Sequence, residues 1–265
     1  MTKTWTRILI LALALGGAAL PAAWAGTSAA PGVPGDAPAA PIAAPNDPFG
    51  NWIDHFDLYA TGSQMHGQGG WKGWANNPGA GALTSDVQAR SLPNSVDILG
   101  ATDLVHEYTG YSSGTWTYTG WMYIPGGFTG QTYFILLNAY DDAGTTNNWS
   151  TQVCFNGALG TVIDDVAADC AASSPISIIF DQWVEVRVVI DLDSNTQSFY
   201  YNGELLYSDS WTEHVSTGGG LNIAAVDLFA NTAPTVYWDD VSLSNLPFSD
   251  GFESGDTVEW HVAVP

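Results

Sequence analysis

The chain has 265 residues, and its 27 acidic residues against five Lys and Arg give a formal net charge of −22 at pH 7. Nucleic acids and anionic membranes attract proteins mainly through Lys and Arg that neutralise phosphates, so this charge argues against both as partners. Neutral ligands and cations remain compatible with it.

The first 25 residues predict a signal peptide. Lys3 and Arg7 precede an apolar run, which ends before the small residues of Ala23-Trp24-Ala25. An uncleaved membrane anchor is the alternative, but an apolar run of about 13 residues is short for roughly 30 Å of hydrocarbon. We therefore expect a secreted protein that is extracellular, or that lies in the periplasm or on the outer surface of a bacterium. It should have no transmembrane span once the signal peptide is removed.

Composition divides the remaining chain into three parts. Residues 26–48 are mostly Ala, Pro and Gly, which predicts a disordered linker. Residues 49–246 are long enough for one domain with a single core. Residues 247–265 form an acidic tail that resembles a short element near the ends of many exported bacterial proteins. This tail has three open interpretations: docking on the domain, sorting or attachment, and no specific role.

Side-chain alternation in the middle part is typical of β-strands. From Trp183 to Asp193, valine, isoleucine and leucine occupy every second position, and Asn202-Gly203 then predicts a tight hairpin. Many short strands between turn clusters predict an all-β fold, a two-sheet antiparallel β-sandwich of the jelly-roll type. The other expected strands are Ile53–Tyr59, Leu83–Arg90, Thr115–Ile124, Thr132–Asn138, Thr151–Phe155, Gln197–Tyr201, Glu204–Ser208, Leu221–Phe229 and Thr235–Leu243.

The chain has two cysteines, Cys154 and Cys170. An even number of cysteines in an exported protein favours a disulfide over free thiols. Closing a loop of about 15 residues would stabilise the fold by roughly 3 kcal/mol in the chain-entropy model. A metal or redox role is disfavoured because the spacing is not Cys-x-x-Cys and no histidine lies nearby.

Three segments carry a resemblance to a known superfamily. The segment from Asp191 to Gly203 is similar to the D-x-D…Y-x-N-G hairpin of concanavalin A-like and laminin-G-like jelly rolls. Residues 56–63 with Gly69-Gly70-Trp71 resemble the entry strand of secreted bacterial jelly rolls, and Tyr237 to Leu243 resembles the closing strand of carbohydrate-binding modules. The resemblance covers roughly residues 51–245 and implies a fold, whereas this superfold hosts many functions.

Proteins of the superfamily that this chain resembles often hold a structural calcium ion between their first and last strands. By alternation, Tyr237, Asp239, Val241 and Leu243 share one apolar face, so the Asp239 carboxylate would be partly buried. Few cations are available to pair with it, which favours a hard cation with oxygen ligands. We expect Asp57 and Asp239, with Asp240 next, to bind calcium; hydrated carboxylates at strand ends are the alternative.

Aromatic side chains suggest contacts with sugars, because flat rings stack on the apolar faces of pyranoses. Trp71 and Trp74 lie in a glycine-rich segment where an exposed platform could form, although packing of a tryptophan into the core is the alternative. Trp121 and Tyr123 share the more polar side of their strand and are second candidates.

No catalytic residue is assigned. The Glu-x-Asp-x-x-Glu strand of laminarinase-like glycanases is absent from the sequence, as is His-Glu-x-x-His, and no Gly-x-Ser-x-Gly elbow between a strand and a helix is expected. We therefore expect a non-catalytic, lectin-like protein that binds a neutral glycan or cell-surface polysaccharide. An adhesive or structural protein is the alternative, and a divergent lyase or glycoside hydrolase would need two titratable residues that face each other in a cleft.

Overall fold

The computed structural model describes residues 50–171 and 175–245. The predicted signal peptide (1–25), linker (26–48) and acidic tail (247–265) lie outside the described residues. Regular structure within the described ranges consists of fifteen strands and two short 3-10 helices, η1 (Trp74–Asn76) and η2 (Pro78–Ala80). A search of these ranges for a helix long and apolar enough to cross a membrane found none.

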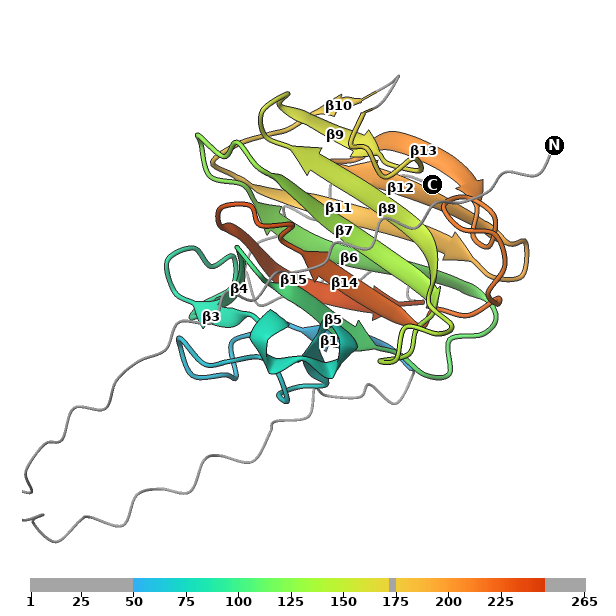
Figure 1. The fold of residues 1–265 in the computed structure, drawn as a ribbon, viewed down its shortest axis with the longest axis horizontal. Helices are drawn as coiled ribbons and strands as arrows, with labels where there is room; N and C mark the ends of the chain where they lie inside the picture. Colours follow the sequence, from blue (N-terminus) through green and yellow to red (C-terminus); the bar gives the residue numbers. More distant parts are fainter. Residues whose placement is uncertain (1–49, 172–174, 246–265) are drawn as a thin grey trace, which may run out of the picture. The chain divides into compact units, whose positions relative to one another are not determined.

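The strands form two antiparallel sheets, one in front of the other in Figure 1. This arrangement confirms the predicted β-sandwich. The eight-stranded sheet has the order β13 (Glu204–Ser210), β12 (Thr196–Tyr201), β11 (Trp183–Asp191), β6 (Thr115–Tyr123), β15 (Val236–Ser244), β4 (Ser95–Ile98) and β3 (Leu83–Ser85), with β1 (Trp52–Asp54) also paired to β15. The seven-stranded sheet has the order β10 (Ile176–Ser177), β9 (Thr161–Asp164), β8 (Asn148–Asn156), β7 (Gln131–Ala139), β14 (Ala225–Phe229), β5 (Asp103–Glu107) and β2 (Trp71–Gly73).

The hairpin of β12 and β13 shows how local sequence sets local structure. Asn202 and Gly203 connect the two strands with φ angles of 50° and 76°. Both angles lie in the left-handed region that Asn and Gly adopt most readily, and this region gives a two-residue turn the twist of the flanking strands. In neighbouring β11, alternate residues are buried as predicted from the sequence.

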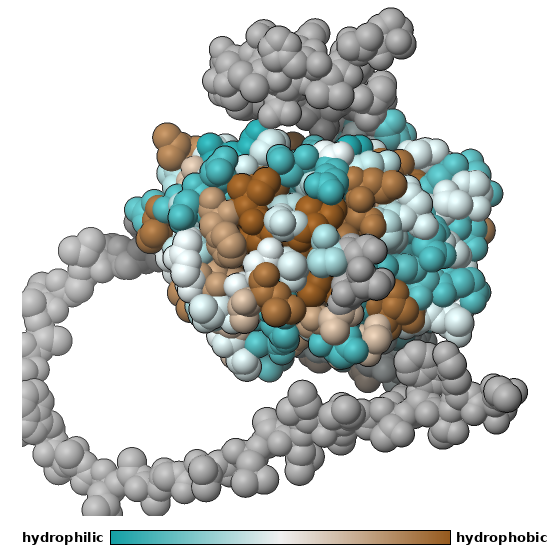
Figure 2. Space-filling view, turned by 90° about the horizontal axis from the view of Figure 1, so that it is seen from above, coloured by the Kyte–Doolittle hydropathy of each residue, from teal (hydrophilic) through white to brown (hydrophobic). Residues whose placement is uncertain are grey.

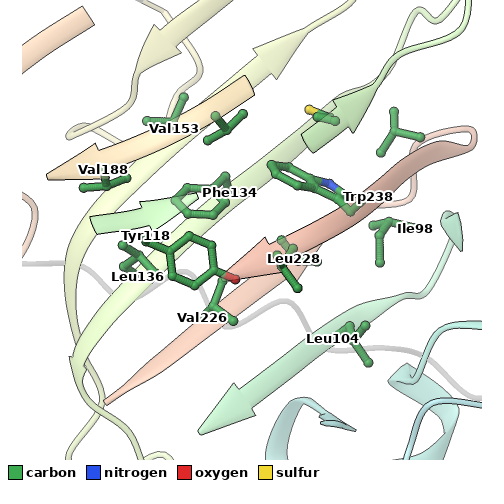
Figure 3. Packing of buried hydrophobic residues seen from close by; sticks show 14 of the residues in the cluster. Ile98, Leu104, Tyr118, Phe134, Leu136, Val153, Val188, Val226, Leu228 and Trp238 are labelled. Atoms are coloured by element: carbon green, nitrogen blue, oxygen red, sulfur yellow. The ribbon is translucent and has the colours of Figure 1, made fainter. Parts of the chain in front are cut away.

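The core consists of side chains from both sheets (Figure 3). The ring of Phe134, from β7, lies 5.5 Å from the ring of Trp238, on β15, and 5.4 Å from that of Tyr118, on β6. Burying a large apolar side chain such as Phe134 contributes about 1.5 to 3 kcal/mol. These rings fill the space between the sheets, which leaves the outer sheet faces available for binding.

The closing strand differs from the alternation expected of it. The pairing of β15 with β6 shifts register between Asp239 and Ser242, and Asp240 has a φ angle of 46°. A bulge of this kind reverses which side chains face the core. Asp239 therefore pairs with Trp121, on the outward side of β6, and it does not share a face with Leu243, which pairs with the buried Tyr118.

Three expected strands, those from Ile53, Leu83 and Leu221, are several residues shorter in the structure, and the last of them begins only at Ala225. The first ends at Asp54 because the chain turns at Phe56, whose φ angle is 58°. The strand that starts at Leu83 ends at Ser85, and the chain then enters a loop that reaches β15. Several strands of two to five residues were not predicted, since such lengths are too short for alternation to mark them: β2, β4, β5, β9 and β10.

The predicted disulfide is present between Cys154, on β8, and Cys170 in the loop after β9. Both cysteines are buried and pack with Ile163 and Tyr133 in a small cluster on the seven-stranded sheet. The disulfide therefore holds the loop of residues 165–170 against the sheet, beside Tyr133.

One end of the sandwich carries the outermost strands of both sheets, β10 and β13. Figure 2 looks from above onto the side where Figure 1 shows these strands, and hydrophobic residues gather in the middle of that view. Leu159, in the turn before β9, and Leu205, on β13, are exposed apolar side chains. Within the described residues, this end thus combines strand edges that have no further strand paired to them with exposed apolar side chains.

Candidate functional site

A groove of about 450 Å³ lies on the outer face of the seven-stranded sheet. Its volume falls within the range of about 300 to 1,000 Å³ that small-molecule sites occupy. The lining combines aromatic rings, side-chain amides and carboxyl groups: Trp74, Asp103, Gln131, Tyr133, Ile135, Trp149, Gln152, Ala168, Asp169, Asp227, Phe229 and Asn231.

Strand pairing brings these residues together. On β14, Asp227 and Phe229 face outward while Val226 and Leu228 point into the core, as alternation requires. Asp227 lies opposite Ile135 of β7, and Phe229 lies between Tyr133 of β7 and Asp103 of β5. The floor of the groove therefore runs across neighbouring strands, which are about 4.8 Å apart.

Two pairs of stacked rings form part of the groove lining. The rings of Trp74 and Trp149 have centroids 6.2 Å apart and an interplanar angle of 24°. The rings of Tyr133 and Phe229 have centroids 5.9 Å apart and an angle of 28°. Flat, half-buried rings of this kind offer apolar faces to a ligand at a small cost in conformational entropy.

Asp103 and Asp227 form a pair of carboxyl groups in the lining. Asp227 is only 3% exposed, and Oδ1 of each carboxyl has no hydrogen-bond partner within the described ranges. Burial raises the pKa of both groups, and the charge of Asp103 raises the pKa of Asp227 further. When one of the two is protonated, it can donate a hydrogen bond to the other. The groove thus contains two desolvated acceptor groups.

The charge of the groove is acidic. Asp103, Asp169 and Asp227 line it, and none of the described lining residues is Lys or Arg. Lys72, on β2, contacts the Tyr140 ring 5.2 Å from its centroid, but its ammonium group forms ion pairs with Glu107 and, at 2.6 Å, with Asp142. Its charge is therefore already balanced by two other carboxylates.

The two tryptophans predicted from the glycine-rich segment have different environments. Trp74 lines the groove. Trp71 is 1% exposed, packs against Trp52 and Phe56, and donates a hydrogen bond from Nε1 to Asp54 at 2.9 Å. Because its ring is enclosed by the core, Trp71 cannot contact a surface ligand. The expectation for Trp71 is therefore corrected in favour of core packing.

Trp121 and Tyr123 lie on the other sheet, outside the groove. Both face outward from β6 and are half-buried. The Arg90 guanidinium covers the ring of Trp121 at 3.7 Å from its centroid. Tyr123 packs against Trp183, with ring centroids 5.6 Å apart. The structure thus divides the four predicted ligand residues among the groove, the core and the opposite surface.

Two of the three predicted metal ligands, Asp239 and Asp240, lie at the β15 bulge, and the charge of the third, Asp57, acts on Asp239. Asp239 is fully buried, and its oxygens accept hydrogen bonds from the backbone N–H groups of Arg90 (2.7 Å), Ser91 (3.2 Å) and Asp240 (2.8 Å). Burial raises the pKa of Asp239 to about 8, with contributions from the charges of Asp240 and Asp57. The loop after β3 thus covers a carboxyl group that has two acidic neighbours.

The donor atoms in this cluster fit a calcium ion in part. Asp57 and Asp239 have carboxylate oxygens, the ligands that calcium prefers, but these already accept backbone N–H hydrogen bonds, in the case of Asp57 from Asn94 at 3.2 Å. Asp240 is already engaged, since its oxygens contact His55 Nδ1 (2.6 Å), Ser91 Oγ (2.8 Å) and Arg90 Nη1 (2.6 Å). A metal ion would have to displace these partners to bind Asp240. Over residues 50–171 and 175–245, no group of three or more His, Cys, Asp or Glu side chains is arranged to hold a metal.

Most of the groove residues were not predicted from the sequence. The missed residues include Asp103, Tyr133, Trp149, Asp227 and Phe229. One available signal was a single acidic residue inside an apolar run, as in Ala225-Val226-Asp227-Leu228-Phe229. Another was the strand from residue 131, in which both alternating sets of side chains are apolar, because such a strand needs cover on both faces.

Comparison with known proteins found no matching family model and no matching curated sequence. Among solved structures, the chain is similar to a cellulose-induced protein, with a TM-score of 0.44 and 15% identity over 75% of this chain and 93% of that chain. A Trypanosoma rangeli sialidase in complex with 2,3-difluorosialic acid has a TM-score of 0.44 and 14% identity over 64% of this chain and 28% of that chain. The ligand-binding domain of botulinum neurotoxin serotype D in complex with N-acetylneuraminic acid has a TM-score of 0.37 and 14% identity over 65% of this chain and 45% of that chain.

The matched part of this chain therefore spans less than half of the sialidase and toxin structures. All three TM-scores lie below 0.5, so these similarities do not indicate a function for this chain.

Proposed function

We propose that this protein binds carbohydrate in the groove of the seven-stranded sheet and does not cleave it. The observation that carries this proposal is a 450 Å³ groove that combines aromatic rings with side-chain amides and carboxyl groups. Aromatic rings stack on the apolar faces of sugar rings, while the polar groups accept or donate hydrogen bonds to hydroxyls.

The ligand in this proposal has no acidic groups. Asp103, Asp169 and Asp227 line the groove, and the whole chain has a net charge of −22. A uronate or sialate in the groove would place another anion beside buried carboxyls, which costs free energy in a low-dielectric site.

A second candidate function, cleavage of a polysaccharide, is favoured by the pair of Asp103 and Asp227 in a groove. The two carboxyls of most glycoside hydrolases stand about 5 to 9.5 Å apart, with the sugar or a water molecule between them. Asp103 and Asp227 instead lie within hydrogen-bond reach of each other. This separation supports a binding role better than hydrolysis. Release of reducing or unsaturated ends from a polysaccharide panel would establish cleavage instead.

We also propose that the chain is exported and that Asp57 and Asp239, with backbone carbonyl oxygens, hold a structural calcium ion. The Cys154–Cys170 disulfide supports export, because disulfides persist mainly in oxidising compartments. The acidic neighbours of buried Asp239 support a divalent cation there, since the ion would offset their charge.

A glycan array followed by calorimetry on the exported full chain, with and without a calcium chelator, tests the binding proposal. We expect at least one non-acidic glycan to bind, and Trp149→Ala to weaken it at least about tenfold, as for a central aromatic contact. Tyr123→Ala, on the opposite sheet, is the matched control and should leave affinity unchanged. Absence of any bound glycan, capture of protein partners alone, or sensitivity only to Tyr123→Ala would contradict the proposal.

A further inference from the structure

Two buried carboxyl oxygens in the groove have no hydrogen-bond donor other than a proton shared between the two carboxyls. Oδ1 of Asp103 and Oδ1 of Asp227 are shielded from solvent and have no partner among the residues the structure describes. Both residues line the groove, and Asp227 is 97% buried. Buried acceptors that are left unpaired are costly, so a ligand that supplies donors at this point gains binding free energy.

The surroundings of the pair favour positive charge. Asp169 adds a third carboxyl group to the lining, which contains no Lys or Arg. Lys72, on the edge strand beyond β5, is held by Glu107 and Asp142. The rings of Tyr133 and Phe229 complete the lining next to the pair, and aromatic faces attract cations.

An ammonium group meets both requirements at once. It offers three N–H donors and no acceptor, so a single group can satisfy two oxygens. Its charge also allows both carboxyls to ionise, which a neutral hydroxyl cannot do. We infer that the groove prefers glycans with a free, protonated amine, and that Asp103 and Asp227 bind the ammonium group. This inference rests on the proposed carbohydrate binding and names the ligand class for the same site.

The test compares three oligosaccharides of one length and linkage that differ only at one ring position. They are an oligomer of glucosamine, the same oligomer N-acetylated, and an oligomer of glucose. Each is titrated into the full chain at a pH at which the glucosamine amine is protonated. We expect the glucosamine oligomer to bind at least tenfold more tightly than the other two. Equal or tighter binding of the glucose or N-acetylated oligomer overturns the inference alone. If none of the three binds and the glycan array is also empty, the proposed function fails as well.

Matched variants separate the carboxyl pair from the general negative charge of the protein. Asp103→Asn with Asp227→Asn removes two acidic groups from the groove, and Glu204→Gln with Glu213→Gln removes two elsewhere. We expect the first pair to weaken glucosamine oligomer binding at least tenfold and to change glucose oligomer binding less than threefold. The second pair should leave both unchanged. Equal losses in the two double variants would show non-specific attraction and would overturn the inference. A preference for the glucose oligomer that appears only when calcium is added would also overturn it.

Discussion

Trp74 and Trp149 lie nearly parallel in the groove lining, with ring centroids 6.2 Å apart, although they come from η1 and β8. Each ring supports the other, so their contributions to ligand binding should be coupled. We predict that Trp74→Ala and Trp149→Ala each weaken glycan binding by at least about 1.4 kcal/mol, which is tenfold in affinity. Calorimetry on the two single variants and the double variant should give a double-variant loss smaller than the sum. Additive losses would show that the two rings contact the ligand independently.

Replacing Asp227 by Asn should stabilise the fold at neutral pH. In the unfolded chain this carboxyl ionises near pH 4, whereas burial and the charge of Asp103 raise its pKa in the folded state. Above about pH 4 the folded state therefore holds more protons than the unfolded state, and stability falls as pH rises through the interval between the two pKa values. Asn cannot ionise, and its amide can donate to Asp103.

Urea unfolding across the pH range checks this expectation. We expect Asp227→Asn to be more stable than the parent by about 1 to 3 kcal/mol at neutral pH, the usual cost of a buried, unsatisfied polar group. The difference should shrink towards pH 4. Asp86→Asn, at an exposed position, is the control and should change stability by less than about 0.5 kcal/mol. A less stable Asp227→Asn at neutral pH would mean that the carboxylate has a stabilising partner in solution.

Removing the disulfide should weaken both the fold and the groove. The bond joins residues 16 positions apart, and the double substitution of Cys154 and Cys170 by Ala should cost about 3 kcal/mol of stability. Tyr133 packs against the disulfide, and Asp169 lies in the loop that it closes. Glycan affinity should therefore fall together with stability. Unfolding curves and calorimetry measure both, and unchanged affinity in the folded double variant would show that the loop does not shape the groove.

Calcium binding, if Asp239 is a ligand, should strengthen with rising pH. Burial and the charges of Asp240 and Asp57 raise the pKa of Asp239 to about 8, so a calcium ion must displace its proton at lower pH. Calorimetry should show affinity that increases from pH 6 to about pH 8, with release of a proton on binding within that range. Asp239→Asn and Asp57→Asn should remove binding, and Asp86→Asn should not. Calcium binding that persists in Asp239→Asn would place the ion elsewhere.

The amino-acid sequence determined the features that depend on neighbours along the chain. Alternation in Trp183 to Asp191 specified a half-buried strand, and Asn202-Gly203 specified the hairpin turn between β12 and β13. The cysteine count and spacing predicted the disulfide that the structure contains. These features follow from a period of two in the side chains and from the backbone angles that particular residues adopt.

Only the tertiary structure decided which outward-facing side chains meet. Alternation assigns Asp227 to one face of its strand, but the pairing of β14 with β5 and β7 places Asp103, Tyr133 and Ile135 around it. A bulge also moved Asp239 off the face that strict alternation gave it. The physical reason is that strand order and register arise from contacts between distant segments and from core packing, which act on the whole chain at once.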